Sequence, residues 1–258
     1  MEMITKIGLK NWKIDLTAQR IDFLDNRFYF SEDGTAVPSV TTLLEAYPKG
    51  AAFYEWLKKN GEDSDTIRDE AGRKGSLVHG LTESYDNGEE VSLLNEEGYV
   101  VYKMVEWVMF ECYVEFWSRF PFEIIHTELS LVSKSLGFAG TLDRIIEMNG
   151  KRVLLDIKTS GSIWPSFWLQ LAAYKQLFQE ASLEKIDEVA ILWLNAKTRT
   201  DGKKDTCQGK GWQLISLADT ARDWQLFKAT QQLWLAENGT QTPKAFSYQL
   251  KHQLNAVA

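Results

Sequence analysis

Two apolar segments joined by Asn149-Gly150 constrain the fold of this chain more than any other feature. Both residues of this pair tolerate positive φ, so the dipeptide favours a tight hairpin between strands over residues 138–148 and 151–158. A third segment rich in Ile, Val and Leu precedes them at residues 123–132. We therefore expect three consecutive strands at the centre of the chain.

Helical patterns flank these strands on both sides, because apolar residues recur there at spacings of three and four. Ser39 follows Pro38 and can cap the first of these helices. We expect helices at 39–44, 51–60, 65–86, 97–119, 165–181 and 217–236, and further strands within 12–30 and at 188–195 and 211–216. This order predicts an α/β or α+β fold with a sheet covered by helices.

Composition excludes several classes of protein. Hydrophobic residues make up 44% of the 258 residues, which permits a sizeable core, and two cysteines are too few for a four-cysteine zinc site or an iron–sulphur cluster. The net charge of −7 argues against a nucleic-acid coat protein but not against an enzyme that acts on DNA. The sequence shows neither a signal peptide nor a membrane span, so we expect a cytoplasmic protein.

Two acids stand inside the apolar strands of the predicted hairpin. An unpaired carboxylate in such a place costs several kcal/mol, and the hairpin brings Asp143 and Asp156 onto neighbouring strands. The two-residue period of a strand points Asp156 and Lys158 to the same face. Two carboxylates beside an ammonium suit Mg²⁺ or Mn²⁺ and the hydrolysis of a phosphodiester. A lone D-x-K is more often a structural ion pair, but the second acid on the hairpin favours the metal site.

The helix expected after Lys158 carries Gln170 and Tyr174, which are four residues apart and share one face. Because this helix returns over the sheet, the two side chains can bind a phosphate or orient Lys158. Taken alone, they would merely be polar residues at the edge of a core.

In chain order, G-x-x-D at 140–143, D-x-K-T-S at 156–160 and Q-L-A-A-Y at 170–174 resemble the PD-(D/E)XK nuclease superfamily, and specifically its RecB-like exonuclease branch. The segment 72–79, which ends in His79, is similar to a further motif of that branch. Residues 37–44 are similar to phage-encoded members and to the mitochondrial genome-maintenance exonuclease. This similarity implies a location in the cytoplasm of a bacterium or of a phage-infected host cell. The resemblance implies a restriction-endonuclease-like core, a central mixed β-sheet flanked by helices, with a mostly helical N-terminal extension. Residue 142 is Leu, where the name of the superfamily has Pro.

The resemblance also implies a set of metal ligands: His79, Asp143, Asp156 and the backbone carbonyl of Ile157, with Glu83 as a supporting residue and no iron–sulphur cluster. Without it, a histidine on a helix is more often an ordinary surface or core residue. Glu128 lies in the strand before Asp143. It is either an outer metal or water-positioning residue or a solvent-facing glutamate, and the sequence leaves both open.

Basic residues in two segments are candidates for contacts with the DNA backbone. Arg68, Arg73 and Lys74 precede the His79 motif, and residues 197–210 form a polar loop that contains Arg199, Lys203 and Lys204. Such loops are often simply solvated.

The resemblance implies a Mg²⁺- or Mn²⁺-dependent DNA exonuclease acting on single-stranded or end-containing DNA in replication, recombination or repair, with proteins of those processes as further partners. The alternatives are an endonuclease of the same superfamily and a non-catalytic DNA-binding module. We expect one nuclease domain over residues 1–258: N-terminal strands and helices at 1–62, which could contact DNA, the core at 63–236 and a C-terminal tail at 237–258.

Overall fold

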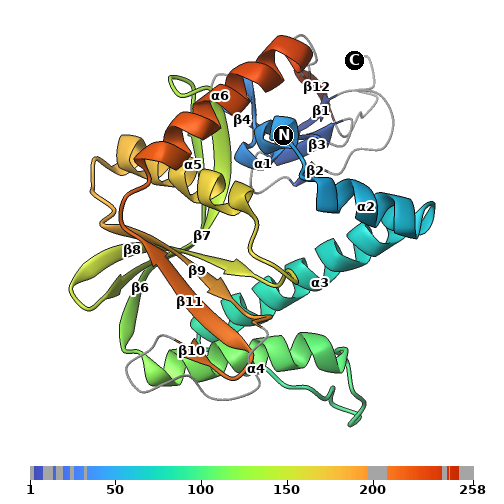
Figure 1. Cartoon of the computed structure of the whole chain (residues 1–258), viewed down its shortest axis with the longest axis vertical. Helices are drawn as coiled ribbons and strands as arrows, with labels where there is room; N and C mark the ends of the chain where they lie inside the picture. Colours follow the sequence, from blue (N-terminus) through green and yellow to red (C-terminus); the bar gives the residue numbers. More distant parts are fainter. Residues whose placement is uncertain are drawn as a thin grey trace, which may run out of the picture.

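The computed structural model describes residues 26–31, 34–196, 208–239 and 243, and the backbone of residues 3–7, 14–15, 20–23 and 245–249. A six-stranded sheet lies at its centre, in the order β10-β11-β9-β8-β7-β6 (Figure 1). The pair β8–β9 is parallel and the other pairs are antiparallel, so the sheet is mixed as expected. Its strands are β6 (Phe122–Ser133), β7 (Phe138–Met148), β8 (Lys151–Lys158), β9 (Glu188–Trp193), β10 (Gln208–Gly209) and β11 (Trp212–Leu217).

The hairpin between β7 and β8 is confirmed. Asn149 and Gly150 have φ values of 53° and 72°, the positive range that the turn requires. Met148 pairs with Lys151 directly across it. The turn therefore fixes the register in which the residues of the two strands face one another.

Helices cover both faces of the sheet. α5 (Pro165–Ser182) and α6 (Ala221–Asn238) pack on one face together with the short α1 (Val40–Leu43), around a core that includes Leu43, Leu171 and Phe227. α3 (Asp63–Asp86) and α4 (Met104–Arg119) pack on the other face, around a core that includes Val78 and Phe116. α5 is also the crossover that joins the parallel strands β8 and β9. The expected central mixed sheet flanked by helices is confirmed.

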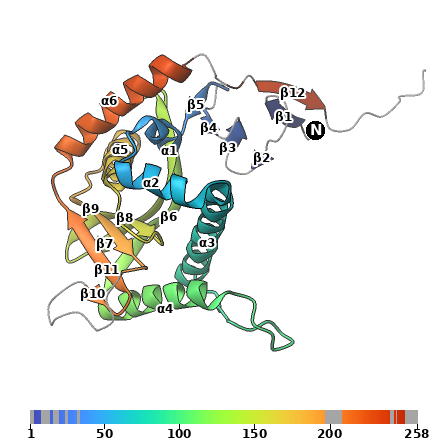
Figure 2. The same cartoon turned by 45° about the vertical axis from the view of Figure 1, so that its right-hand side comes forward.

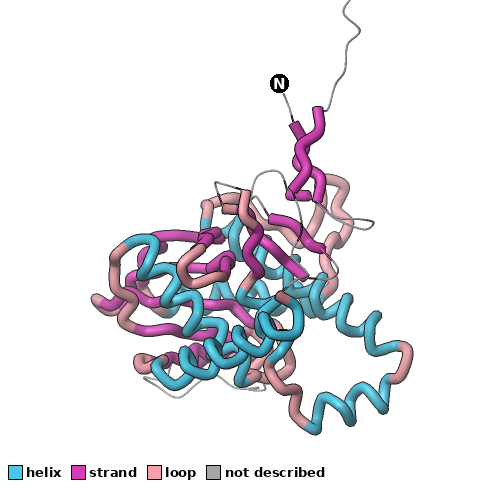
Figure 3. The backbone as a smooth tube through the Cα atoms, turned by 90° about the horizontal axis from the view of Figure 1, so that it is seen from above, coloured by secondary structure: helices cyan, strands magenta, loops and turns pink. Residues whose placement is uncertain are grey.

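The N-terminal part is not mostly helical, and that expectation is wrong. β2 to β5 form a four-stranded antiparallel sheet, followed by α1, the 3₁₀ turn η1 (Leu44–Ala46) and α2 (Ala51–Asn60). The strands expected within 12–30 are present as β2, β3 and β4, and in β4 the adjacent Phe28 and Tyr29 are both buried. The strands are β1 (Met3–Ile7), β2 (Ile14–Asp15), β3 (Arg20–Phe23), β4 (Asn26–Phe30) and β5 (Ala36–Pro38), and β12 (Ala245–Gln249) pairs with β1 as a separate two-stranded sheet (Figure 3).

The helix expected over 97–119 begins only at Met104. Gly98 has a φ of 84° and its N–H donates to the carbonyl of Asn95, which makes a turn rather than a helix. The helix starts where Glu106 accepts from the backbone N–H of Lys103 at 2.8 Å. The loop before α4 projects from the body of the protein (Figure 2). None of the helices in the described part of the chain is long and apolar enough to span a bilayer.

Candidate active site

Three acids lie side by side across three neighbouring strands. Glu128 lies between Thr127 and Leu129, which pair with Arg144 and Leu142 on either side of Asp143, so Glu128 and Asp143 are neighbours across the two strands. Continuing the pairing of β7 with β8 by one residue places Asp156 opposite Asp143 on its other side. Like charges directly opposite on a sheet are destabilising, so this row of carboxylates needs a compensating positive charge.

His79 approaches the row from α3. One ligand atom from each of His79, Glu128 and Asp143 lies within 4.8 Å of the others. Nε2 of His79 is 3.1 Å from the carbonyl oxygen of Ile157; because a carbonyl only accepts, Nε2 donates. This leaves Nδ1, 3.4 Å from Asp143 Oδ2, as the nitrogen with a free lone pair in the neutral ring.

The backbone holds Asp143 and strains Glu128. The N–H of Ile157 donates to Asp143 Oδ2 at 2.8 Å. Glu128 has a φ of 45°, a conformation that costs a non-glycine residue about 1–3 kcal/mol and that clusters at functional sites. Burial raises the pKa of Glu128, and so do the charges of Asp143 and Glu83. Glu128 lies beside His79 and Asp143, and Glu83, one turn after His79 on α3, is half-buried.

Asp156 lies beside this group of three and contacts Lys158. Oδ2 of Asp156 is 2.6 Å from Lys158 Nζ but accepts no aligned hydrogen bond. The side chain is 2% exposed, and burial raises the pKa of Asp156 to about 6 against the opposing effect of Lys158. A carboxylate buried in this way has capacity left to bind a cation.

Lys158 contacts three side chains, of which two, Asp156 and Gln170, are predicted from the sequence. Its Nζ donates to Gln170 Oε1 at 3.0 Å and lies 4.6 Å from the centre of the Phe167 ring. Gln170 Nε2 in turn donates to the hydroxyl of Tyr174 at 3.2 Å. Gln170 and Tyr174 thus form a chain that fixes the ammonium next to Asp156. Phe167 was missed, because an aromatic residue on an amphipathic helix looks like core.

Gly140 makes this packing possible. A Cβ at this position would lie 2.4 Å from Cε1 of Tyr174, far inside van der Waals contact. The glycine of the G-x-x-D motif therefore makes room for the ring of Tyr174, which is 5% exposed.

The donor set fits a hard divalent cation. Carboxylate oxygens and an imidazole nitrogen are the ligand types that Mg²⁺ and Mn²⁺ accept. The crowding of Glu128, Asp143 and Asp156 supplies the negative charge that such an ion would neutralise.

The structure describes three of the six predicted DNA-contacting residues, and these three lie outside the group of candidate ligands. Arg68 pairs with Asp65 at 2.9 Å, and both side chains are exposed. Arg73 pairs at 2.8 Å with Glu106, whose side chain is 1% exposed, so its charge is committed to a buried carboxylate. Lys74 is half-buried. Arg199, Lys203 and Lys204 lie outside the described residues.

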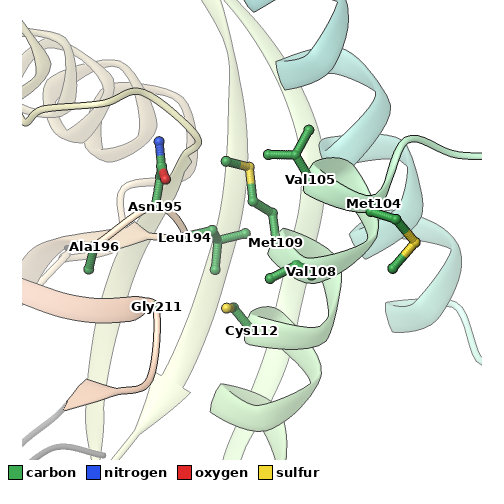
Figure 4. Close-up of a pocket in the computed structure, with 9 residues that line it drawn as sticks. All are labelled: Met104, Val105, Val108, Met109, Cys112, Leu194, Asn195, Ala196 and Gly211. Atoms are coloured by element: carbon green, nitrogen blue, oxygen red, sulfur yellow. The ribbon is translucent and has the colours of Figure 1, made fainter. Parts of the chain in front are cut away.

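A cavity of about 290 Å³ lies elsewhere, between α4 and the ends of β9 and β11 (Figure 4). Its walls are mainly apolar, with Met104, Val108 and Leu194 among them, and none of the predicted site residues lines it. Cys112 faces it, but burial and the charge of Glu115 raise the pKa of this thiol to about 11. The thiol stays protonated near neutral pH, so the cavity offers no nucleophile.

Comparison with known proteins agrees with this geometry. The family model described as "PD-(D/E)XK nuclease superfamily" matches residues 51–252. The chain belongs to this superfamily. Nucleases of the PD-(D/E)XK superfamily usually use Mg²⁺ or Mn²⁺.

One similar solved structure, described as "Crystal structure of SSO0001", is 16% identical with a TM-score of 0.28. The match covers 50% of this chain and 58% of the solved chain. The chain therefore spans little more than half of the length of the solved structure. No curated protein matches the chain.

Proposed function

We propose that this chain is a Mg²⁺- or Mn²⁺-dependent DNA exonuclease of the RecB-like branch, acting on single-stranded or end-containing DNA in replication, recombination or repair. The observation that carries the proposal is the convergence of His79, Glu128 and Asp143 beside the ion pair of Asp156 with Lys158. The RecB-like assignment is supported by the order of the motifs at His79, Asp143, Asp156 and Gln170 along the sequence.

In this proposal the cation is held by His79, Asp143, Asp156 and the carbonyl of Ile157, with Glu128 as a further ligand or as the residue that orients water. When bound, a divalent cation supplies Lewis acidity, which polarises a phosphate and lowers the pKa of a water molecule. We assign the orientation of the attacking water and the stabilisation of charge on the phosphate to the side chains around the cation.

Lys158 has the central role among those side chains. Its ammonium, held next to Asp156 at 2.6 Å, orients the attacking water and stabilises the negative charge that develops on the phosphate. Gln170 positions Lys158 through its Oε1. Tyr174 supports Gln170 by accepting from its amide nitrogen.

We further propose one nuclease domain over residues 1–258, with the N-terminal part at 1–62, the core at 63–236 and the remaining residues as a tail. The pairing of β1 with β12 supports this proposal, because it joins the two ends of the chain.

The test is a time course of cleavage with Mg²⁺ or Mn²⁺ on 5′- and 3′-labelled single- and double-stranded oligonucleotides and on a closed single-stranded circle. We expect stepwise shortening of the linear substrates and an intact circle. Asp156→Ala should abolish cleavage, whereas the matched control Glu147→Ala, an exposed acid on β7, should leave it unchanged. Full cleavage by Asp156→Ala would refute the site, and cutting of the circle would favour an endonuclease.

A further inference from the structure

Arg144, the residue after Asp143, is completely buried. Burying a charged group without partners is very costly, so the partners of this guanidinium indicate what it does. Two of them lie on α3: Nε donates to Asp86 Oδ2 at 2.5 Å, and Nη2 donates to Thr82 Oγ1 at 3.1 Å.

The other contacts of Arg144 lie in the candidate metal site. Nη1 donates to the backbone carbonyl of Asp143 at 2.8 Å and lies 3.3 Å from Oε1 of Glu128. One guanidinium therefore contacts β6, β7 and α3, the three elements that carry the group His79, Glu128 and Asp143.

α3 presents the matching side of this contact. His79, Thr82 and Asp86 are spaced i, i+3 and i+7, so they lie along one face of the helix. Thr82 Oγ1 also donates to the backbone carbonyl of His79 at 2.8 Å. The turn of α3 that carries His79 is thus tied to Arg144 through a single hydroxyl.

Asp86 is itself held from behind. Its Oδ1 accepts from the hydroxyl of Tyr113 at 2.6 Å and from Nε1 of Trp117 at 3.0 Å, both on α4. Figure 2 shows α3 running down to α4, where these contacts form. The negative charge of Asp86 also offsets the positive charge of Arg144. The guanidinium can therefore bind Glu128 while it repels a cation in the metal site less strongly.

We propose that Arg144 is a positioning residue that holds the ligand groups on α3, β6 and β7 in one arrangement before the cation binds. The inference rests on the proposed metal site and goes beyond it, since Arg144 is not a ligand. Only the planar fork of arginine reaches these partners together; a lysine would offer one point charge.

The experiment measures Mn²⁺ binding by calorimetry without DNA, together with thermal unfolding of the metal-free protein. Arg144→Lys should weaken Mn²⁺ binding by about 10–100-fold, the usual effect of losing a group that orients metal ligands. Thr82→Val is the milder variant, and it replaces Arg144→Lys in the binding measurement if Arg144→Lys does not fold. It removes both hydrogen bonds of the Thr82 hydroxyl, to Arg144 and to the carbonyl of His79, and should weaken Mn²⁺ binding by about 2–10-fold, which is in the range of a net hydrogen-bond contribution.

Tyr113→Phe is the matched control, because it removes a hydrogen bond to Asp86 from the side away from the ligands. It should lower the melting temperature yet keep the Mn²⁺ affinity of the wild type. The inference is overturned if the folded Arg144 and Thr82 variants bind Mn²⁺ like the wild type, or if Tyr113→Phe weakens binding as much as they do. A wild type that binds no Mn²⁺ would instead overturn the proposed function, and this inference with it.

Discussion

Replacing Gly140 by alanine tests how tightly the Lys158 side of the site is packed. The added Cβ would lie 2.4 Å from Cε1 and 3.2 Å from Cζ of Tyr174, whereas carbon atoms in contact are about 3.5–4.0 Å apart. The ring or the strand must therefore move by about 1 Å to restore an ordinary contact. The ring is not free to move, because it is buried and its hydroxyl is bonded to Gln170.

Overpacking of this kind costs about 1–3 kcal/mol, and we expect Gly140→Ala to lower the free energy of unfolding by that amount. At an unobstructed position the same change stabilises a protein by up to about 1 kcal/mol. Gly72 on α3, where a Cβ would meet nothing within 4 Å, gives that control. The displaced Tyr174 should also shift Gln170, so the turnover number of the folded variant should fall.

The assay is urea unfolding of the metal-free protein in a double-mutant cycle with Tyr174→Ala. Removing the ring costs about 3–5 kcal/mol by leaving a cavity. In that background Gly140→Ala should cost nothing, because the clash is gone and the methyl group fills part of the space. An equal cost of Gly140→Ala in both backgrounds would refute the reasoning.

Three further predictions concern charge. Because the folded-state pKa of Asp156 is raised from 3.8 to about 6, the metal-free protein is destabilised as its carboxyl ionises; the penalty is absent below pH 4 and complete above pH 7. Asp156→Asn should therefore stabilise the metal-free protein by about 2–3 kcal/mol at pH 8 but little at pH 4, measured by thermal unfolding in EDTA. Saturating Mn²⁺, at about 100 times its Kd, should stabilise the wild type by about 2.7 kcal/mol, and Glu128→Gln should reduce this gain at the same Mn²⁺ concentration. Arg73→Ala should lower the free energy of unfolding by about 1–3 kcal/mol, since it unpairs the buried Glu106, while DNA affinity in a filter-binding assay changes little.

Each of these has a result that contradicts it. A stability gain of Asp156→Asn that is the same at both pH values would show that ionisation of the carboxyl is not its cause. Equal Mn²⁺ stabilisation in Glu128→Gln and the wild type would exclude Glu128 from the site. Loss of DNA affinity in a fully stable Arg73→Ala protein would show that Arg73 contacts DNA.

The parts of the fold that sequence predicts best are those with strong local signals. The Asn149-Gly150 turn and the apolar strands around it are confirmed, because turn chemistry and period-two patterns act over a few residues. The start of α4 was placed seven residues early, since the apolar residues after Gly98 continue the helical pattern although the backbone turns there. The apolar pattern alone does not reveal where a local turn and a capping residue set the first residue of a helix.

The candidate site divides in the same way. Asp156, Lys158 and Gln170 are close in sequence, and their contact follows from one strand and the helix after it. Arg144 was missed, although a charged residue inside an apolar strand and next to Asp143 was the signal. Its partner Asp86 is 58 residues away, and no local pattern joins two positions so far apart.

The β8–α5–β9 crossover has a consequence for how such a site can change over generations. Lys158, Gln170 and Tyr174 all lie between residues 151 and 193, so a single exchange of that segment between homologous genes would transfer them together. His79 and Glu128 come from separate elements outside it and would have to match the incoming segment. Recombination can thus replace the lysine-bearing part of the site in one event, while the histidine-bearing part can change only by steps that stay compatible with it.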